Sequence, residues 1–118
     1  MKKSERQQLF ALNFSKLIQY VFEQGWSVVI GEVQRPLEMQ EIYFKNGKSK
    51  TMDSQHLDKM AGDLFLFIDG EIRWDAESYK PLADYWESLH PDNVAGYRWI
   101  NKQGKRWDPY HFEMKDSF

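Results

Sequence analysis

Two histidines and one aspartate in this 118-residue chain have the residue types and spacing of a metal site. His56 precedes Asp63 by seven positions, and Asp63 enters an apolar run that predicts a buried strand. Their side chains can converge on one metal ion if the chain between them turns back. His111, near the C-terminus, offers a third ligand. Two imidazoles and one carboxylate leave a tetrahedral zinc ion with an open position for water, which is the arrangement of a catalytic site.

Other polar residues flank this predicted metal site. Asp108 lies three positions before His111, where its carboxylate can act as the base beside the water. Glu113 alternates on the same strand face as His111, so we expect it to orient that imidazole. Ser54 either hydrogen-bonds within its own loop or touches the substrate, and both roles stay open. The third histidine, His90, ends a predicted helix, where interaction with the helix dipole is more common than metal binding.

The pattern of these residues is similar to that of a known family. Ser54, His56 and Asp63 form S-x-H-x(6)-D, and Asp108 with His111 forms an acid-x-x-His pair that is followed by Phe-Glu. The combination resembles the VanY/VanX D-Ala-D-Ala peptidases, which are zinc peptidases of the LAS type. It looks most like the small phage endolysins that cut the L-alanyl-D-glutamate bond of peptidoglycan.

The resemblance extends over residues 29–113 and implies roles for further residues. It implies one Zn²⁺ ion, bound by the three ligands named above. Arg35 precedes a proline at the exit of a predicted strand, and the resemblance implies that it helps to hold the site and the polar groups of the substrate. Gln40 follows in the same segment, where we expect it either to contact the substrate or to support the residues that do. Trp107 is expected at the mouth of the site.

The function implied is that of a phage or prophage endolysin-like peptidase that hydrolyses the L-Ala–D-Glu bond of the peptidoglycan stem. Short connections, and the small residues Ala61 and Gly62 beside the ligands, favour an open groove and therefore an endopeptidase. A D-Ala-D-Ala carboxypeptidase is the alternative within the family. An alternative of another class is a non-catalytic, zinc-stabilised binding module of a virion or secretion machine. That alternative depends on Lys59, where the family usually has glycine.

Length and composition exclude several other classes of protein. The chain is long enough for a single domain, residues 1–118, which we expect to be a monomer. It has no cysteine, which excludes disulfides and thiolate-bound zinc. Its net charge of -2, without a dense basic patch, argues against nucleic-acid binding. No apolar stretch reaches the length needed for membrane insertion.

The N-terminal segment has positive charge but no apolar core of secretory length. We therefore expect the protein to be made in the host cytoplasm. If its substrate is the cell wall, another component must release it. The resemblance implies that a phage holin does so.

The apolar periodicity predicts an α+β fold of the hedgehog/DD-peptidase-like type, with a small antiparallel sheet that carries the ligands and helices packed against it. Ser4 and Gln7 predict a capping box at the start of a helix that ends near Gly25. Residues 26–33 predict a strand, and residues 37–45 predict a short helix.

The second half of the chain has equally clear signals. Asp69 and Gly70 predict a two-residue β-hairpin after the strand that carries Asp63. Residues 75–89 predict a helix with a proline in its first turn. Residues 96–100 and 110–114 predict a strand and its return around a turn at Gln103 and Gly104.

Overall fold

The computed structural model describes residues 2–33 and 60–115. These residues form a sheet in which the strand order is β1-β2-β5-β4, with β3 paired to β2, and every pairing is antiparallel. The strands are β1 (Ser27–Ile30), β2 (Ala61–Ile68), β3 (Glu71–Ile72), β4 (Asn93–Ala95) and β5 (His111–Met114). The helices are α1 (Lys3–Glu23) and α3 (Lys80–Leu89), with short 3-10 helices η1 (Ala76–Tyr79) and η2 (Gly96–Arg98). The predicted helix over residues 37–45 lies outside the described residues.

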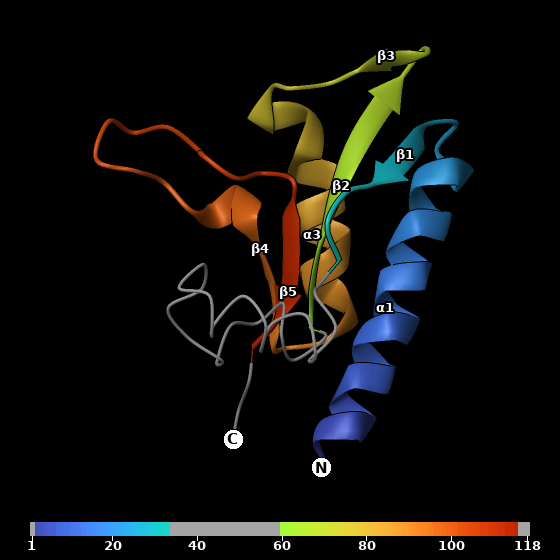
Figure 1. The fold of residues 1–118 in the computed structure, drawn as a ribbon. Helices are drawn as coiled ribbons and strands as arrows, with labels where there is room; N and C mark the ends of the chain where they lie inside the picture. The colour runs from blue at the N-terminus through green and yellow to red at the C-terminus, as the bar shows by residue number, and fades with distance from the viewer. Residues whose placement is uncertain (1, 34–59, 116–118) are drawn as a thin grey trace, which may run out of the picture.

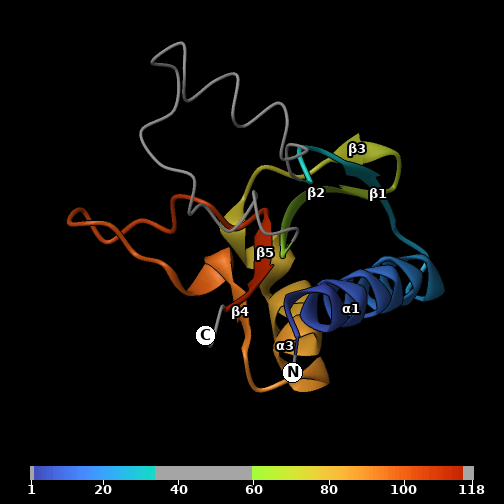
Figure 2. The same ribbon diagram turned by 60° about the horizontal axis from the view of Figure 1, so that its bottom comes forward.

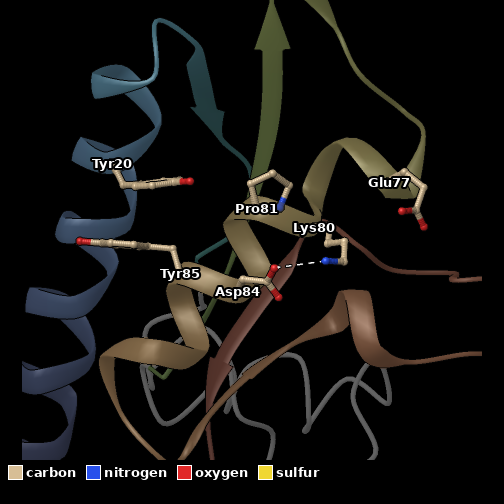
Figure 3. A pocket seen from close by; sticks show the side chains of 6 residues that line it. All are labelled: Tyr20, Glu77, Lys80, Pro81, Asp84 and Tyr85. Carbon is tan, nitrogen blue, oxygen red and sulfur yellow. Dashed lines mark hydrogen bonds and ion pairs between the residues drawn. The ribbon is translucent and has the colours of Figure 1, made fainter.

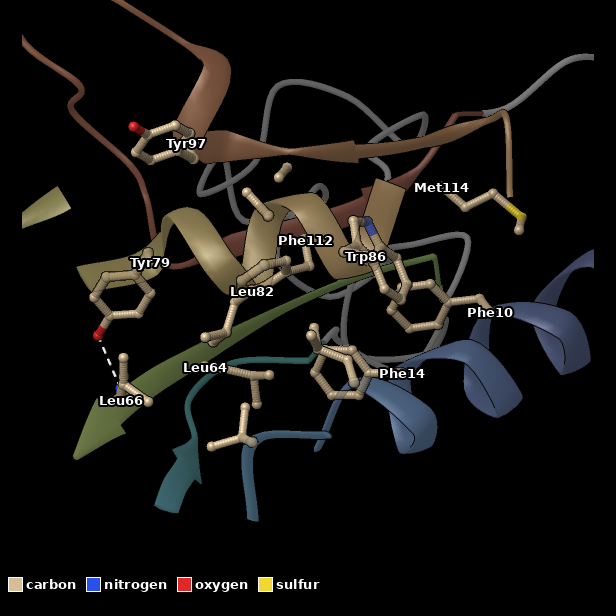
Figure 4. Packing of buried hydrophobic residues seen from close by; sticks show 14 of the residues in the cluster. Phe10, Phe14, Leu64, Leu66, Tyr79, Leu82, Trp86, Tyr97, Phe112 and Met114 are labelled. Atoms are coloured by element: carbon tan, nitrogen blue, oxygen red, sulfur yellow. Dashed lines mark hydrogen bonds between the residues drawn. The ribbon is translucent and has the colours of Figure 1, made fainter. Parts of the chain in front are cut away.

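The two α-helices lie on the same side of the sheet, as Figures 1 and 2 show. Phe10 and Phe14 of α1 meet the edge of Trp86 of α3, with ring centroids 5.6 and 6.3 Å apart (Figure 4). The indole of Trp86 donates to the carbonyls of Val94 and Glu113, 3.2 and 3.0 Å away. Trp86 therefore joins both helices to β4 and β5.

The strands contribute alternate residues to this core. Leu64 and Leu66 of β2, with Phe112 and Met114 of β5, are fully buried on the helix side. Burying each such side chain stabilises the fold by about 1.5–3 kcal/mol. The residues between them face the opposite side of the sheet, because successive side chains of a strand alternate. The expected α+β architecture, with helices packed on one side of an antiparallel sheet, is confirmed.

The start of α1 differs from the prediction. The helix begins at Lys3 with Lys2 as its N-cap residue, so Ser4 lies inside the first turn and the predicted capping box is wrong. Tertiary contacts hold this end instead. The buried Arg6 side chain forms an ion pair with Asp92 at 3.0 Å and donates to the carbonyl of Lys115 at 2.6 Å. The predicted end of the helix is correct, since Gly25 follows it with a φ of 85°.

The Asp69–Gly70 hairpin is confirmed. Both residues have positive φ values, 55° and 78°, between the paired ends of β2 and β3. The backbone beyond this hairpin is held by the buried Tyr79, whose hydroxyl accepts from the Leu66 amide at 2.8 Å and donates to the Arg73 carbonyl at 2.9 Å. Burial raises the pKa of Tyr79 to about 12, so its hydroxyl keeps the proton that it donates.

The predicted helix over residues 75–89 is present in two parts. Asp75 caps the 3-10 helix η1 by accepting from the amide and the hydroxyl of Ser78. Pro81 then lies in the first turn of α3, as predicted, where its missing N–H has no intrahelical partner to lose. His90 follows as the C-cap, and its Nδ1 accepts from the Asp92 amide at 3.0 Å.

The predicted strand over residues 96–100 is wrong. The strand that pairs with β5 is β4, just before it, and residues 96–98 form the 3-10 helix η2. Close packing explains the change, because a Cβ on Gly96 would overlap the carbonyl oxygen of Asp108. The chain thus turns at Gly96 against the segment that leads into β5. The predicted turn at Gly104 is present, with a φ of 78°.

Candidate active site

Asp63 and His111 lie directly opposite each other where β2 pairs with β5. Their side chains share the face of the sheet that points away from the helices, and Nδ1 of His111 is 3.3 Å from Oδ1 of Asp63. The backbone of Asp63 is fixed by hydrogen bonds of 2.9 Å with Gly31 and Glu32. The antiparallel register therefore brings together two of the three predicted metal ligands.

Glu113 holds the other nitrogen of the same imidazole. Its Oε1 lies 2.8 Å from Nε2 of His111, as expected for two residues on one face of a strand. With Nε2 hydrogen-bonded to a carboxylate, Nδ1 is the nitrogen that faces Asp63. A carboxylate behind one imidazole nitrogen, with the other nitrogen turned toward the metal, is the usual support of a histidine ligand.

Negative charges around His111 favour the protonated form of its ring. Burial of the ring works against protonation, but the hydrogen bonds to Asp63 and Glu113, with the negative charges of Glu113 and Asp108, raise the pKa of His111 to about 9. A cation is therefore favoured at this point of the sheet. Oδ1 of Asp63 is buried, and Nδ1 of His111 faces it at 3.3 Å. A buried carboxylate oxygen opposite an imidazole nitrogen, at a separation that one metal ion can bridge, fits a metal site.

Asp108 lies in the turn that leads into β5. The amide of His111 approaches the Asp108 carbonyl at 3.4 Å, and the half-buried Asp108 carboxylate is close enough to raise the pKa of His111. Gly96 makes this position possible by allowing the backbone of η2 to pack against the turn. The predicted base and the predicted ligand are thus on the same side of the molecule.

Trp107 adjoins the site through a second tryptophan. Its ring stacks on Trp99 at a centroid distance of 5.5 Å, and Trp99 lies 5.1 Å from the His111 ring. Sequence reasoning placed Trp107 at the mouth of the site but missed Trp99. The predicted turn at Gly104 could have revealed Trp99. In the hairpin around this turn Ile100 pairs with Arg106, so Trp99 and Trp107 lie opposite each other one position farther from the turn.

A separate hollow of about 580 Å³ lies on the helix side of the sheet (Figure 3). The rings of Tyr20 and Tyr85 stack there at 4.3 Å. Its lining consists of Tyr20, Glu77, Lys80, Pro81, Asp84 and Tyr85. It contains none of the predicted site residues within the part of the chain that the structure describes.

Comparison with known proteins places the chain in a family. Residues 5–110 match the model of the phage L-alanyl-D-glutamate peptidases. The chain belongs to this family. The predicted resemblance to the small phage endolysins that cut the L-alanyl-D-glutamate bond is therefore confirmed. No curated protein sequence matches the chain significantly.

A solved structure shares the fold of this phage L-alanyl-D-glutamate peptidase family member. The L-Ala D-Glu endopeptidase ChiX of Serratia marcescens superposes with a TM-score of 0.61 and 19% sequence identity. The match covers 90% of this chain and 77% of that chain. At this identity the similarity concerns the fold alone.

Four of the predicted site residues, Arg35, Gln40, Ser54 and His56, lie outside the described residues, and their roles stay predictions. Within residues 2–33 and 60–115, no group of three or more His, Cys, Asp or Glu side chains is placed to hold a metal ion. The described part supplies Asp63 and His111 as a pair. A complete three-ligand site requires the predicted third ligand, His56.

Proposed function

We propose that this chain is a zinc-dependent endopeptidase that hydrolyses the bond between L-alanine and D-glutamate in the peptidoglycan stem. Membership of the phage L-alanyl-D-glutamate peptidase family supports the choice of this bond as the one that is cleaved. The main structural support for a bound metal ion is the pairing of Asp63 with His111. It leaves a buried carboxylate oxygen facing an imidazole whose other nitrogen is already held by Glu113.

Asp63 and His111, with His56, would hold the zinc ion in this proposal. These are oxygen and nitrogen donors, and Asp63 and His111 come from adjacent strands in a fixed register. When bound, zinc lowers the pKa of a water molecule and polarises the carbonyl group of the peptide. Zinc binding would require His111 to lose its Nδ1 proton, and the bond between Nε2 and Glu113 would retain the other proton, which leaves a lone pair on Nδ1 for the metal.

Asp108 is the proposed base. Its carboxylate accepts a proton from the attacking water and delivers it to the amino group of D-glutamate as the peptide bond breaks. The C–N bond is replaced by a C–O bond, and no group beyond water is consumed. Arg35 is proposed to bind polar groups of the substrate, and Gln40 and Ser54 to line the same site.

The bond proposed to be cleaved lies inside the peptide stem and not at its D-alanine end. Gly62, which we expected to open the groove, faces the helices, where a Cβ would lie 2.9 Å from the Phe14 ring. Gly62 therefore admits α1 and does not widen the groove. Cleavage within the stem is therefore supported by the family, whose description names the L-alanyl-D-glutamate bond.

Digestion of purified peptidoglycan, followed by labelling of new amino termini, tests the proposal. We expect new D-glutamate termini, which a metal chelator suppresses and added zinc restores. The Asp108→Asn variant is the matched control, because it keeps the ligands but lacks the base. Release of free D-alanine without D-glutamate termini would instead indicate a D-Ala-D-Ala carboxypeptidase. No cleavage by zinc-loaded protein would favour a non-catalytic binding module.

Where the protein acts follows from the same proposal. In the part of the chain that the structure describes, no helix is both long and apolar enough to cross a membrane. We propose that the protein acts as a monomer on the peptide stem of the cell wall, after release through a holin. Expression with and without a holin, with lysis as the measurement, tests this step.

A further inference from the structure

Three aromatic rings form a stack that runs outward from the proposed metal site. His111 contacts Trp99 at 5.1 Å with an interplanar angle of 35°, and Trp99 stacks on Trp107 at 5.5 Å and 23°. Trp99 is half-buried within the stack, whereas Trp107 is 59% exposed. An exposed indole supported from behind by a second indole is a flat apolar surface beside a catalytic face.

A short hairpin builds this surface. Ile100 and Arg106 form a β-bridge, and the Asn101 amide donates to the Lys105 carbonyl at 2.8 Å. The side-chain oxygen of Asn101 accepts from the amides of Gln103 and Lys105 at 3.0 and 2.9 Å. These bonds fix the turn from within. The two tryptophans, one residue outside the bridge on each strand, are therefore positioned before any ligand binds.

The hairpin is also fixed to the body of the protein. The guanidinium of Arg106 donates to the Tyr97 carbonyl at 2.7 Å and lies 4.1 Å from the centre of the Tyr97 ring. The Tyr97 hydroxyl donates in turn to Glu77, 3.0 Å away on η1. The loop between β4 and β5 projects from the sheet (orange to red in Figure 1), yet Tyr97 ties its base to η1.

We infer that Trp99 and Trp107 form a subsite for N-acetylmuramic acid, the sugar that carries the peptide stem. The inference rests on the proposed function, in which L-alanine precedes the cleaved bond. In peptidoglycan that alanine is joined to the sugar through a lactyl group. Alanine and the lactyl group together span about 7 Å, the length of two extended residues. The sugar ring of a bound substrate must therefore lie close to the site, within reach of a surface two ring contacts from His111.

The chemistry of the surface suits a sugar. One face of a pyranose ring presents mainly C–H groups, and these meet the negative face of an indole favourably. The hydroxyl and acetamido groups at the rim of the ring stay in contact with water. Trp107 provides the exposed face, and Trp99 keeps its ring from rotating into solvent.

Trp74 provides a matched control on the same side of the sheet. It is 60% exposed, nearly the same as Trp107, but its ring contacts Phe65 and Tyr110 at 5.8 Å each. Tyr110 also donates to the Trp74 carbonyl at 2.7 Å, a bond that a change of the Trp74 side chain retains. Trp74→Ala therefore removes an equally exposed indole without touching the stack on His111.

Binding and cleavage are both measurable. Muramyl-L-alanine, added to the ¹⁵N-labelled protein, should shift the indole N–H signals of Trp99 and Trp107, whereas lactoyl-L-alanine, which lacks the sugar, should not. Trp107→Ala should weaken muramyl-L-alanine binding about tenfold. It should also lower kcat/KM for a muramyl-peptide about tenfold more than for the same peptide with a lactoyl cap. Trp74→Ala should leave this ratio between the two substrates as it is in the wild type.

The possible results separate the subsite from the proposed function. Equal loss on the two substrates in Trp107→Ala, or unshifted indole signals, would overturn the sugar subsite. If muramyl-L-alanine shifts both indole signals while the wild type cleaves neither substrate, the subsite stands and the endopeptidase proposal fails. Thermal unfolding of each variant, expected to match the wild type, shows that a loss does not arise from misfolding.

Discussion

His111 and Phe112 are neighbours on β5, but their side chains lie on opposite faces of the sheet in different surroundings. Phe112 is fully buried and meets the edge of Trp86 at 6.1 Å, among apolar side chains. His111 is 7% exposed, and its two ring nitrogens face the carboxylates of Asp63 and Glu113. Apolar side chains surround Phe112, whereas carboxylates surround His111. One strand therefore serves the core on one side and the proposed metal site on the other, and single substitutions can separate the two.

The largest effect is expected from His111→Ala. Loss of this proposed ligand should remove bound zinc and reduce hydrolysis of peptidoglycan to the uncatalysed background, because the proposed site then lacks one of its three protein ligands. Metal analysis of the purified variant measures this directly. His90→Ala is the control, since His90 caps α3 and bonds to the Asp92 amide. Zinc retained in His111→Ala, or lost in His90→Ala, would contradict the ligand assignment.

Phe112→Ala should act on the other side of the same strand. Removing this buried ring leaves a cavity beside Trp86 and should lower the free energy of unfolding by about 3–5 kcal/mol. That is a large part of the total stability of a small domain. Denaturant unfolding measures the change. An unchanged midpoint would show that the helix side of β5 is not the core.

Asp108→Asn should separate catalysis from metal binding. The variant keeps the predicted ligands but cannot accept a proton, so the rate should fall by roughly two or more orders of magnitude. Zinc content and the unfolding midpoint should stay close to wild type. Full activity in Asp108→Asn would move the base elsewhere, and Glu113 would become the first candidate.

Glu113→Gln should have the smallest effect of the four. The amide oxygen can still accept from Nε2 of His111, but the negative charge behind the imidazole is lost. Changes of this kind typically weaken metal affinity by about 10- to 100-fold. Competition with a chelator measures the affinity. Unchanged affinity would mean that Glu113 serves the fold and not the metal.

The sequence predicted the parts of this comparison that depend on local rules. Alternation along β5 placed Glu113 and His111 on one face, and the contact of 2.8 Å confirms their proximity. Turn chemistry predicted the hairpin at Asp69 and Gly70. The same alternation, applied to β2, would have shown that Gly62 faces the helices and Asp63 the site.

Other parts depend on long-range contacts and could not be predicted in this way. The strand β4 has only three residues and no strong apolar pattern. Its place is set by contacts far along the chain, such as the Asn93 side chain donating to the Trp86 carbonyl at 2.9 Å. The contact of Trp99 with His111 likewise requires the chain to turn back at Gly96. The turn at Gly104 predicts that Trp99 pairs with Trp107, but neither the contact of Trp99 with His111 nor that of Asn93 with Trp86 has a signature in local sequence.

Anomalous diffraction at the zinc edge, from crystals grown with zinc, tests the central assignment most directly. The account predicts one strong peak within about 2.2 Å of both Oδ1 of Asp63 and Nδ1 of His111, with Glu113 still bonded to Nε2. A peak at His90 without one at this pair, or no peak in zinc-saturated crystals, would contradict it.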